Sequence, residues 1–207
     1  MNIEIRTKDE SISWEELVDL FHEAFQERLD QGLNFTCSFF TPEDLERRSA
    51  GNVVLVAIDK DNNFLAGTAF VKIVKDNKGP WAYLSNMAIN SNYKRCGIGS
   101  KLEERRIEIA RTNGCKYVIS DTAAGATSSV KWHKKNGFYP FSLRSFGSTN
   151  YYSIIFRKQL KHHWLWSNPN CCAMHFALSS VINKLYRNSD GSLTKLGKIL
   201  FFFRKGE

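Results

Sequence analysis

Apolar residues follow two different periods along the first part of the chain, and these periods predict strands and helices. Isoleucines alternate with charged residues over residues 3–7, which predicts a first strand. Ser13 can cap a helix, with Glu16 at the capping-box position, and apolar residues then recur every three or four positions as far as Phe25. An amphipathic helix should therefore follow the first strand.

β-Branched and aromatic runs dominate the middle of the chain. A short helix is expected from Thr41, because Thr can cap a helix and the proline after it suits the first turn. The runs at 53–58 and 64–74 flank a turn rich in Asp and Asn, which is typical of a hairpin. A further strand is expected at 81–89, and a helix with one apolar side should begin at Ile98.

The remaining predicted elements are shorter. Gly114 and Gly137 are placed to end two helices, because glycine adopts the left-handed conformation found at helix C-termini. The elements are a strand at 117–120, a helix at 128–135, and strands at 138–146 and 151–156. This order predicts a mixed α/β fold with early antiparallel strands.

Length and composition are those of a protein with one main core. The chain has 207 residues, of which 43% are hydrophobic, and it can bury a substantial core. We expect one domain at residues 1–160 and an appended segment at 161–207. There is no run of about 18 consecutive apolar residues, and residues 1–10 lack the apolar core of a signal peptide, so a cytoplasmic location is expected.

The basic charge is concentrated in the C-terminal segment. The formal net charge is +8, and residues 161–207 hold seven Lys and Arg against Asp190 and Glu207. That segment therefore carries +5, and the rest of the chain carries +3. This distribution does not favour nucleic-acid binding by the main domain.

Cysteine and histidine patterns do not favour a metal centre. The five cysteines show no paired CxxC spacing, which argues against a zinc site and against a disulfide framework. His162, His163 and His175 lie near Cys171 and Cys172, but adjacent ligands make poor tetrahedral geometry. We therefore expect free thiols and no bound metal.

The candidate chemistry lies in a turn between a predicted strand and a predicted helix, with the sequence Lys94-Arg95-Cys96-Gly97-Ile98-Gly99. At such a position the unpaired N–H groups and the dipole of the helix attract a phosphate. Gly97 and Gly99 let the backbone approach a ligand closely, and Lys94 and Arg95 add positive charge. The turn lacks the third glycine of a dinucleotide fingerprint and the Gly-Lys-Ser/Thr of a P-loop, and a pyrophosphate is its natural ligand.

A second motif about 35 residues later makes the pattern more specific. The segments Leu84–Ile89 and Tyr93–Leu102 together resemble the acyl-coenzyme A motif of the GNAT acetyltransferases, usually Arg/Gln-x-x-Gly-x-Gly/Ala. Lys135-Asn136-Gly137-Phe138 resembles the second motif of that family. The resemblance covers roughly residues 3–160 in element order.

The resemblance implies a mostly antiparallel central sheet flanked by helices, with a helical C-terminal extension in this chain. It implies a slot for the arm of acetyl-coenzyme A between residues 87–89 and 117–121. Met87, Ala88 and Ile89 would contact the pantetheine. The residues implied around the pyrophosphate are Lys94, Arg95, Cys96, Gly97, Ile98, Gly99 and Ser100. Lys94 stands where the family most often has Arg or Gln. Lysine keeps a positive charge at this position, but it lacks a planar side-chain group with several hydrogen-bond donors.

Acetyl transfer needs a neutral amine, a polarised thioester carbonyl and a proton donor for the departing thiolate. His133 stands where the family often has a tyrosine, and a histidine titrates near neutral pH, so it is the first candidate for the proton donor. Tyr139 is the reserve donor. The candidates for the general base are Asp121 and a water chain from Ser85 or Tyr83.

We therefore expect transfer of an acetyl group from acetyl-coenzyme A to a primary amine of a small molecule, an amino sugar or a peptide. The alternative is a noncatalytic acyl-coenzyme A-binding module whose tail engages a membrane or protein partner, because His133 replaces the usual tyrosine and no carboxylate lies in 81–89. Transfer to a hydroxyl group and longer acyl donors stay open, because a cofactor motif says little about the acceptor.

Residues 161–207 lie beyond the resemblance and predict a basic, amphipathic helical extension. Apolar residues from Met174 to Leu185 form a stripe at helical spacing. A second stripe begins at Leu193, and its basic residues are Lys195, Lys198, Arg204 and Lys205. Such a segment suits docking on the main domain, contact with a second subunit in a homodimer, or contact with an anionic membrane surface.

Overall fold

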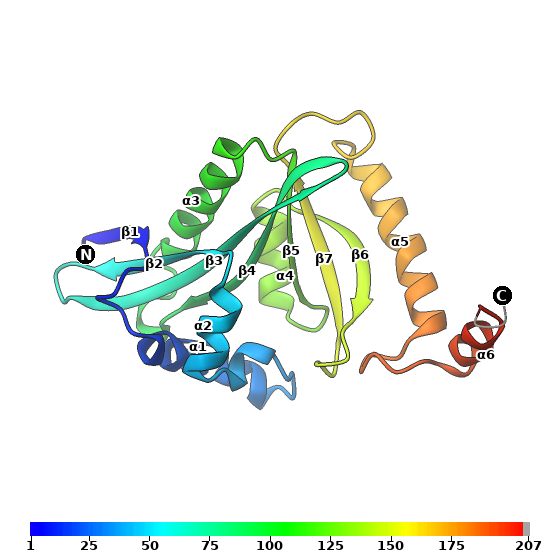
Figure 1. Cartoon of the computed structure of the whole chain (residues 1–207), viewed down its shortest axis with the longest axis horizontal. Helices are drawn as coiled ribbons and strands as arrows, with labels where there is room; N and C mark the ends of the chain where they lie inside the picture. The colour runs from blue at the N-terminus through cyan, green and yellow to red at the C-terminus, as the bar shows by residue number, and fades with distance from the viewer. Residues whose placement is uncertain (205–207) are drawn as a thin grey trace. The chain divides into compact units, whose positions relative to one another are not determined.

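The computed structural model describes the backbone of residues 1–204 and the side chains of residues 1–199 (Figure 1). Lys205, one of the basic residues predicted to flank the apolar C-terminal stripe, lies outside the described residues. The chain forms two compact units. The first comprises residues 1–31 and 35–119, and the second comprises residues 32–34 and the chain from residue 120 onward.

The first unit is built on four consecutive antiparallel strands. These are β1 (Ile3–Thr7), β2 (Val53–Asp59), β3 (Phe64–Asp76) and β4 (Gly79–Ile89). The predicted hairpin of β2 and β3 is confirmed, with Val53 opposite Val71 in the register. The next strand in the order, β5 (Tyr117–Ala123), begins in this unit and ends in the second.

Three α-helices and two short 3₁₀ helices complete the first unit. They are α1 (Trp14–Asp30), η1 (Thr36–Phe39), α2 (Pro42–Ser49), η2 (Ser91–Tyr93) and α3 (Ile98–Thr112). The predicted caps are confirmed: Ser13 and Glu16 form a capping box before α1, and the Thr41 side chain accepts a hydrogen bond from the backbone N–H of Asp44. These bonds satisfy N–H groups that a helix start leaves unpaired.

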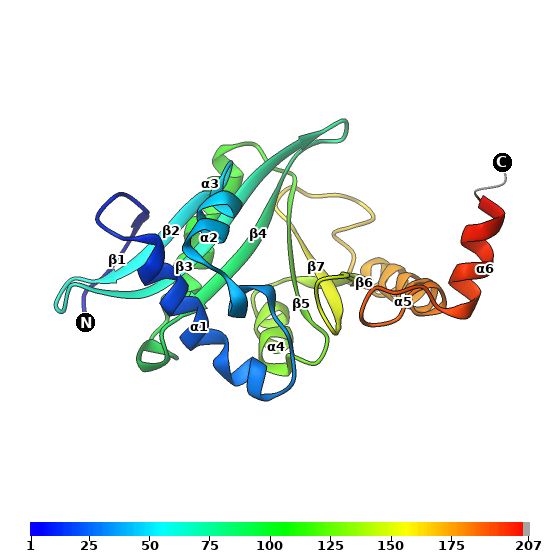
Figure 2. The ribbon, with the colours of Figure 1, turned by 60° about the horizontal axis from the view of Figure 1, so that its bottom comes forward.

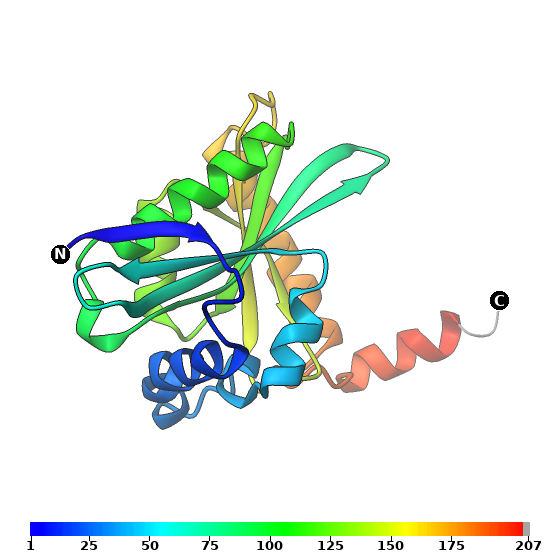
Figure 3. The same ribbon diagram turned by 60° about the vertical axis from the view of Figure 1, so that its left-hand side comes forward.

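The helices of the first unit cover both faces of its sheet (Figure 3). Successive side chains of a strand point to opposite faces, so each buried strand contributes to two cores. On one face Val54, Val56 and Ile58 of β2 pack in a cluster with residues of α1 and α2. On the other face Leu55 and Ala57 pack with Ile98 and Leu102 of α3. This packing holds the start of α3 against the sheet.

The second unit contains a strand pair and three helices. Its elements are the end of β5, α4 (Thr127–Lys135), β6 (Tyr139–Ser145), β7 (Tyr152–Gln159), α5 (Pro169–Tyr186) and α6 (Lys195–Arg204). β6 and β7 are antiparallel, and the strand order is β5-β7-β6. Figure 2 shows α5 beside β6 and α6 continuing beyond the end of α5.

The predicted fold class, mixed α/β with a mostly antiparallel sheet flanked by helices, is confirmed. The predicted division at residue 160 falls just after β7, and it stays a prediction. Among the described residues, no helix combines the length and the apolar character that crossing a membrane requires.

Candidate functional site

The predicted phosphate turn has a backbone suited to binding an anion. Gly97 precedes α3 in the left-handed conformation, with φ 81°, and no side chain caps the start of the helix. Arg95 is also left-handed, with φ 65°. Apart from Gly97 and its two chain neighbours, no described atom lies within 4 Å of the position that a Cβ atom would occupy on Gly97, so the surface is open there. The first N–H groups of α3 and the positive end of its dipole therefore lie beside open space.

The charged side chains of the turn lie at the surface. The Lys94 Nζ atom lies 3.6 Å from the carboxylate of Glu27 on α1, and both side chains are at least half exposed. Such an exposed ion pair contributes at most about 1 kcal/mol and can exchange for a ligand phosphate. Cys96 is exposed, and its thiol lies 3.7 Å from the carbonyl oxygen of Lys94. These groups fit a pyrophosphate without rearrangement of the core.

One carboxylate anchors the turn from α1. Glu23 accepts hydrogen bonds from the side-chain amide of Asn90, at 2.6 Å, and from the backbone N–H of Ser91, at 3.0 Å. Asn90 is buried, and its side-chain oxygen accepts from the backbone N–H of Asn92. The role of Glu23 was not predicted from the sequence, and the structure uses its carboxylate to hold the path of the chain into the turn.

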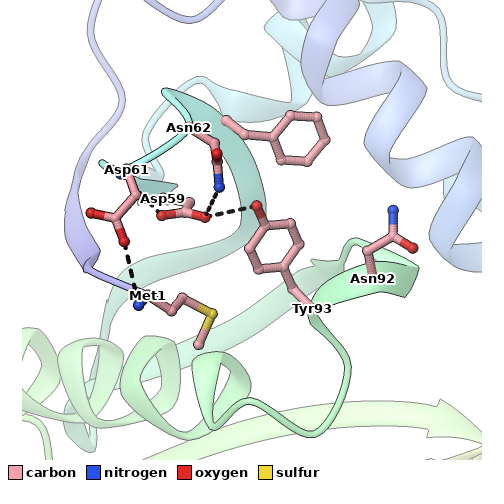
Figure 4. Close-up of a pocket in the computed structure, with 7 residues that line it drawn as sticks. Met1, Asp59, Asp61, Asn62, Asn92 and Tyr93 are labelled. Atoms are coloured by element: carbon pink, nitrogen blue, oxygen red, sulfur yellow. Dashed lines mark hydrogen bonds and ion pairs between the residues drawn. The ribbon is translucent and has the colours of Figure 1, made fainter.

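A second carboxylate anchors the turn from the sheet (Figure 4). Asp59, at the end of β2, accepts hydrogen bonds from the Tyr93 hydroxyl, at 2.9 Å, and from the Asn62 side chain, at 2.8 Å. The hydrogen bonds from Asn62 and then Tyr93 lower the pKa of Asp59, and the bond to Asp59 raises the pKa of Tyr93. The Tyr93 ring also stacks on Phe64, with the ring centroids 5.7 Å apart.

These residues border an open depression beside the turn. Its lining consists of Met1, Asp59, Asp61, Asn62, Phe64, Asn92 and Tyr93. The amino group of Met1 lies 3.3 Å from the carboxylate of Asp61. The acidic groups that line the depression, Asp59 and Asp61, are therefore already paired within the protein. The contacts of Asp59 in the depression support the turn.

A bulge interrupts β4 just before the residues predicted to contact the pantetheine. Thr68 pairs with Ala88 and Phe70 pairs with Ser85, so two residues of β4 face one residue of β3. One of the two, Asn86, is left-handed, with φ 49°. A bulge leaves a residue without its ladder partner and bends the strand. Met87 is the second residue of the bulge, and the pairing with β3 resumes at Ala88 and Ile89, opposite Thr68 and Gly67.

A buried ion pair supports this bulge from α3. The side chains of Arg106 and Glu103 are 3% and 5% exposed, and they form a salt bridge. The Arg106 guanidinium also donates to the backbone carbonyls of Phe70 and Ser85, at 3.4 and 3.3 Å. This pair was not predicted from the sequence, although two charged residues on the apolar side of a helix are a visible signal.

The second motif forms the C-terminus of α4. Gly137 has φ 78°, the Phe138 N–H donates to the His133 carbonyl at 3.0 Å, and the Gly137 N–H donates to the Lys134 carbonyl at 3.2 Å. These bonds are the two that define a Schellman motif. The Phe138 ring also contacts the His133 ring edge-on, at 5.5 Å between centroids. The motif therefore fixes the position of His133.

His133, the predicted proton donor, is only 6% exposed. Its Nδ1 atom lies 2.8 Å from the Ser129 carbonyl oxygen, and its Nε2 atom lies 3.1 Å from the Ser120 hydroxyl. A carbonyl only accepts, so in the neutral ring Nδ1 carries the proton and Nε2 accepts from Ser120. The ring stacks on Phe156 at 4.5 Å. The ring is thus held in one orientation, and its catalytic role stays a prediction.

The other candidates are placed as follows. Tyr139 begins β6 and is 39% exposed. Asp121 lies within β5, and both alternatives for the water chain, Ser85 and Tyr83, lie on β4. The phosphate turn and Met87 belong to the first unit, whereas His133, Tyr139 and Asp121 belong to the second.

Among the described residues no group of three or more His, Cys, Asp and Glu side chains is arranged to hold a metal ion.

Comparison with protein families matches residues 14–138, more than half of the chain, to the acetyltransferase (GNAT) family. No curated protein matches the chain by sequence.

Solved structures share the fold at low identity. A chain of the NatC complex bound to Gag peptide and CoA has 15% identity and a TM-score of 0.61, over 78% of this chain and 100% of that chain. A GNAT family acetyltransferase from Elizabethkingia anophelis with acetyl-CoA bound has 18% identity and a TM-score of 0.58, over 77% and 99%. The ribosomal-protein-S18-alanine N-acetyltransferase from Escherichia coli has 15% identity and a TM-score of 0.58, over 78% and 96%.

Proposed function

Because the chain belongs to the GNAT acetyltransferase family, we propose that it transfers an acetyl group from acetyl-coenzyme A to a primary amine of a small molecule, an amino sugar or a peptide. The observation that carries the proposal is the open, left-handed turn at Gly97, before the uncapped start of α3. Glu23 and Asp59 hold this turn in place from two sides. Exposed backbone N–H groups at the start of a helix suit a diphosphate better than they suit a neutral ligand.

The proposed contacts follow the chain along one edge of the first unit. Met87, Ala88 and Ile89, which lie at the bulge of β4 and directly after it, would bind the pantetheine through their backbone. The residues from Lys94 to Ser100 would surround the pyrophosphate, with Lys94 released from Glu27 to meet its charge. Acetyl-coenzyme A supplies the activated thioester, and a backbone N–H near Met87 or Ala88 would polarise its carbonyl oxygen.

Two residues compete for the role of proton donor. His133 has a fixed ring, but its Nε2 atom accepts from Ser120 in the neutral tautomer, so it would donate only after gaining a proton. Tyr139 is more exposed and could donate its phenolic proton directly. We keep His133 as the first candidate and Tyr139 as the reserve. The general base stays open between Asp121 and a water chain from Ser85 or Tyr83.

Two of the similar solved structures are a complex with a peptide and a ribosomal-protein-S18-alanine N-acetyltransferase, which supports including peptide amines among the candidate acceptors.

We further propose that the catalytic domain spans residues 1–160, that the basic extension spans 161–207, and that the protein acts in the cytoplasm.

The test is a calorimetric titration with acetyl-coenzyme A, followed by detection of thiol release with a panel of small amines, amino sugars and peptides. Gly97→Glu should abolish binding, because it places bulk and negative charge at the phosphates. Gly114→Glu is the matched control, since Gly114 is also left-handed and open but lies at the opposite end of α3. Equal affinity in the two variants would overturn the assigned site.

The noncatalytic acyl-coenzyme A-binding module is the second candidate function. The observation that favours it is the buried His133 ring, in which both nitrogen atoms are hydrogen-bonded. Binding of acetyl-coenzyme A without thiol release across the whole panel would support the module, and release with any amine would exclude it.

A further inference from the structure

The helix α5 has a second apolar face that the rest of the described chain leaves uncovered. One face packs on β6, where His175 stacks on Phe141 with the ring centroids 4.3 Å apart and Cys172 is buried. The opposite face carries five apolar side chains that are 47–70% exposed. They are Met174, Leu178, Val181, Ile182 and Leu185. Their spacing of three and four residues places them in one stripe along the helix.

The helix α6 is joined firmly to the end of α5 (Figure 2). The Thr194 N–H donates to the Tyr186 carbonyl at 3.0 Å, and the Thr194 hydroxyl donates to the Leu185 carbonyl. A Cβ atom on Gly197 would lie 2.2 Å from the Tyr186 carbonyl oxygen, so only glycine permits this contact. On α6, Leu196 and Ile199 are also exposed. We call the exposed apolar side chains of the two joined helices, together with their basic residues, the α5–α6 surface.

The charge around this surface is almost entirely positive. Residues 169–204 contain one acidic residue, Asp190, and five basic residues, which are Lys184, Arg187, Lys195, Lys198 and Arg204. The Asp190 carboxylate accepts from the backbone N–H and the hydroxyl of Ser192, which occupies it within its own turn. A partner that covers exposed apolar side chains among unopposed cations must itself be apolar and anionic.

We propose that the α5–α6 surface binds the face of a lipid bilayer that contains anionic headgroups. Apolar side chains on a helix surface flanked by Lys and Arg are suited to the boundary between headgroups and acyl chains. Each basic residue near an anionic bilayer adds electrostatic attraction that salt weakens. A second copy of the chain is disfavoured as the partner, because it would bring two basic surfaces together without acidic partners. This interaction is independent of acetyl transfer.

The test is cosedimentation of the full chain with vesicles. The protein should bind vesicles of phosphatidylcholine with phosphatidylglycerol, bind vesicles of pure phosphatidylcholine at least tenfold more weakly, and dissociate as salt is added. Binding that is absent, or equal for both vesicles and insensitive to salt, would overturn the proposal.

Two double variants locate the contact. Leu178→Ser with Val181→Ser removes exposed apolar area, and Lys195→Glu with Lys198→Glu reverses charge; each should lower binding at least tenfold. Lys60→Glu with Lys75→Glu is the matched charge control, because both side chains are exposed in the first unit, and it should bind like the unmodified protein. Unchanged binding of both α5–α6 variants would contradict the proposal.

Two further measurements report on folding and on self-association of the variants. Affinity for acetyl-coenzyme A reports folding, since the variants lie outside the phosphate turn, and it should be unchanged. Light scattering without vesicles reports oligomeric state. A dimer that the Leu178→Ser, Val181→Ser variant dissociates would show that a second copy covers the surface, and would also overturn the proposal.

Discussion

The Nε2 atom of His133 lies 3.1 Å from the hydroxyl of Ser120, and the Ser129 carbonyl holds the opposite nitrogen at 2.8 Å. The two bonds select the tautomer with the proton on Nδ1. Ser120 therefore contacts the nitrogen atom that the proposed proton transfer from His133 would use.

His133→Phe should keep a ring against Phe156 but remove the proton donor. We expect kcat to fall by about 10² or more, with KM for acetyl-coenzyme A nearly unchanged. Steady-state kinetics measure both constants. An unaltered kcat in His133→Phe would remove His133 from the mechanism and turn attention to Tyr139.

Glu23 and Glu27 both lie on α1 near the phosphate turn, but they should affect acetyl-coenzyme A binding in opposite directions. Glu23→Ala removes three hydrogen bonds that hold Asn90 and Ser91, so the affinity should fall about tenfold. Glu27→Ala frees Lys94 from its ion pair, so the affinity should stay equal or rise slightly. Calorimetric titration of the two variants makes the comparison. Equal losses would mean that the turn does not depend on Glu23.

Local signals in the sequence predicted the local structure. The Ser13 and Glu16 capping box, the hairpin turn after β2 and the helix end at Gly137 each depend on residues within a few positions, and each was predicted correctly. The glycine at position 97 of the family motif precedes α3 in the left-handed conformation, and phosphate binding by this turn stays a prediction.

Contacts between distant residues could not be predicted in the same way. Glu23 and Asn90 are 67 positions apart, and no periodicity links an acidic residue on a helix to an amide in a turn. The bulge at Asn86 needs the register with β3, which a single strand does not reveal. His133 fits the helical pattern whether its ring packs in the core or faces a substrate, so only the structure shows that the ring is buried.

The pair of Tyr93 and Asp59 should make the stability of the turn depend on pH at both extremes. Asp59 has its pKa lowered from 3.8, so its contribution is present above 3.8 and is lost as the pH falls through the lowered value. Tyr93 has its pKa raised from 10.0, so its contribution is present below 10.0 and is lost as the pH rises through the raised value.

Tyr93→Phe tests this dependence. The stability difference between the unmodified protein and the variant should be constant from about pH 5 to pH 9 and should shrink beyond both limits. Urea unfolding at a series of pH values measures it. A difference that is independent of pH across the whole range would mean that the hydroxyl of Tyr93 and the carboxylate of Asp59 do not interact in solution.

Arg106 and Glu103 provide a test of how the sheet bulge is supported. Arg106→Met leaves the Glu103 carboxylate buried without its partner, and the free energy of unfolding should fall by about 3–5 kcal/mol. The double variant with Glu103→Leu removes both charges, and apolar side chains should restore much of that stability. Acetyl-coenzyme A affinity should stay low in the double variant, because the carbonyls of Phe70 and Ser85 still lack the guanidinium that holds them at the bulge. Urea unfolding and calorimetric titration of the unmodified protein, the single variant and the double variant separate the effect on stability from the effect on affinity. Full recovery of affinity together with stability would show that the bulge holds its shape without Arg106.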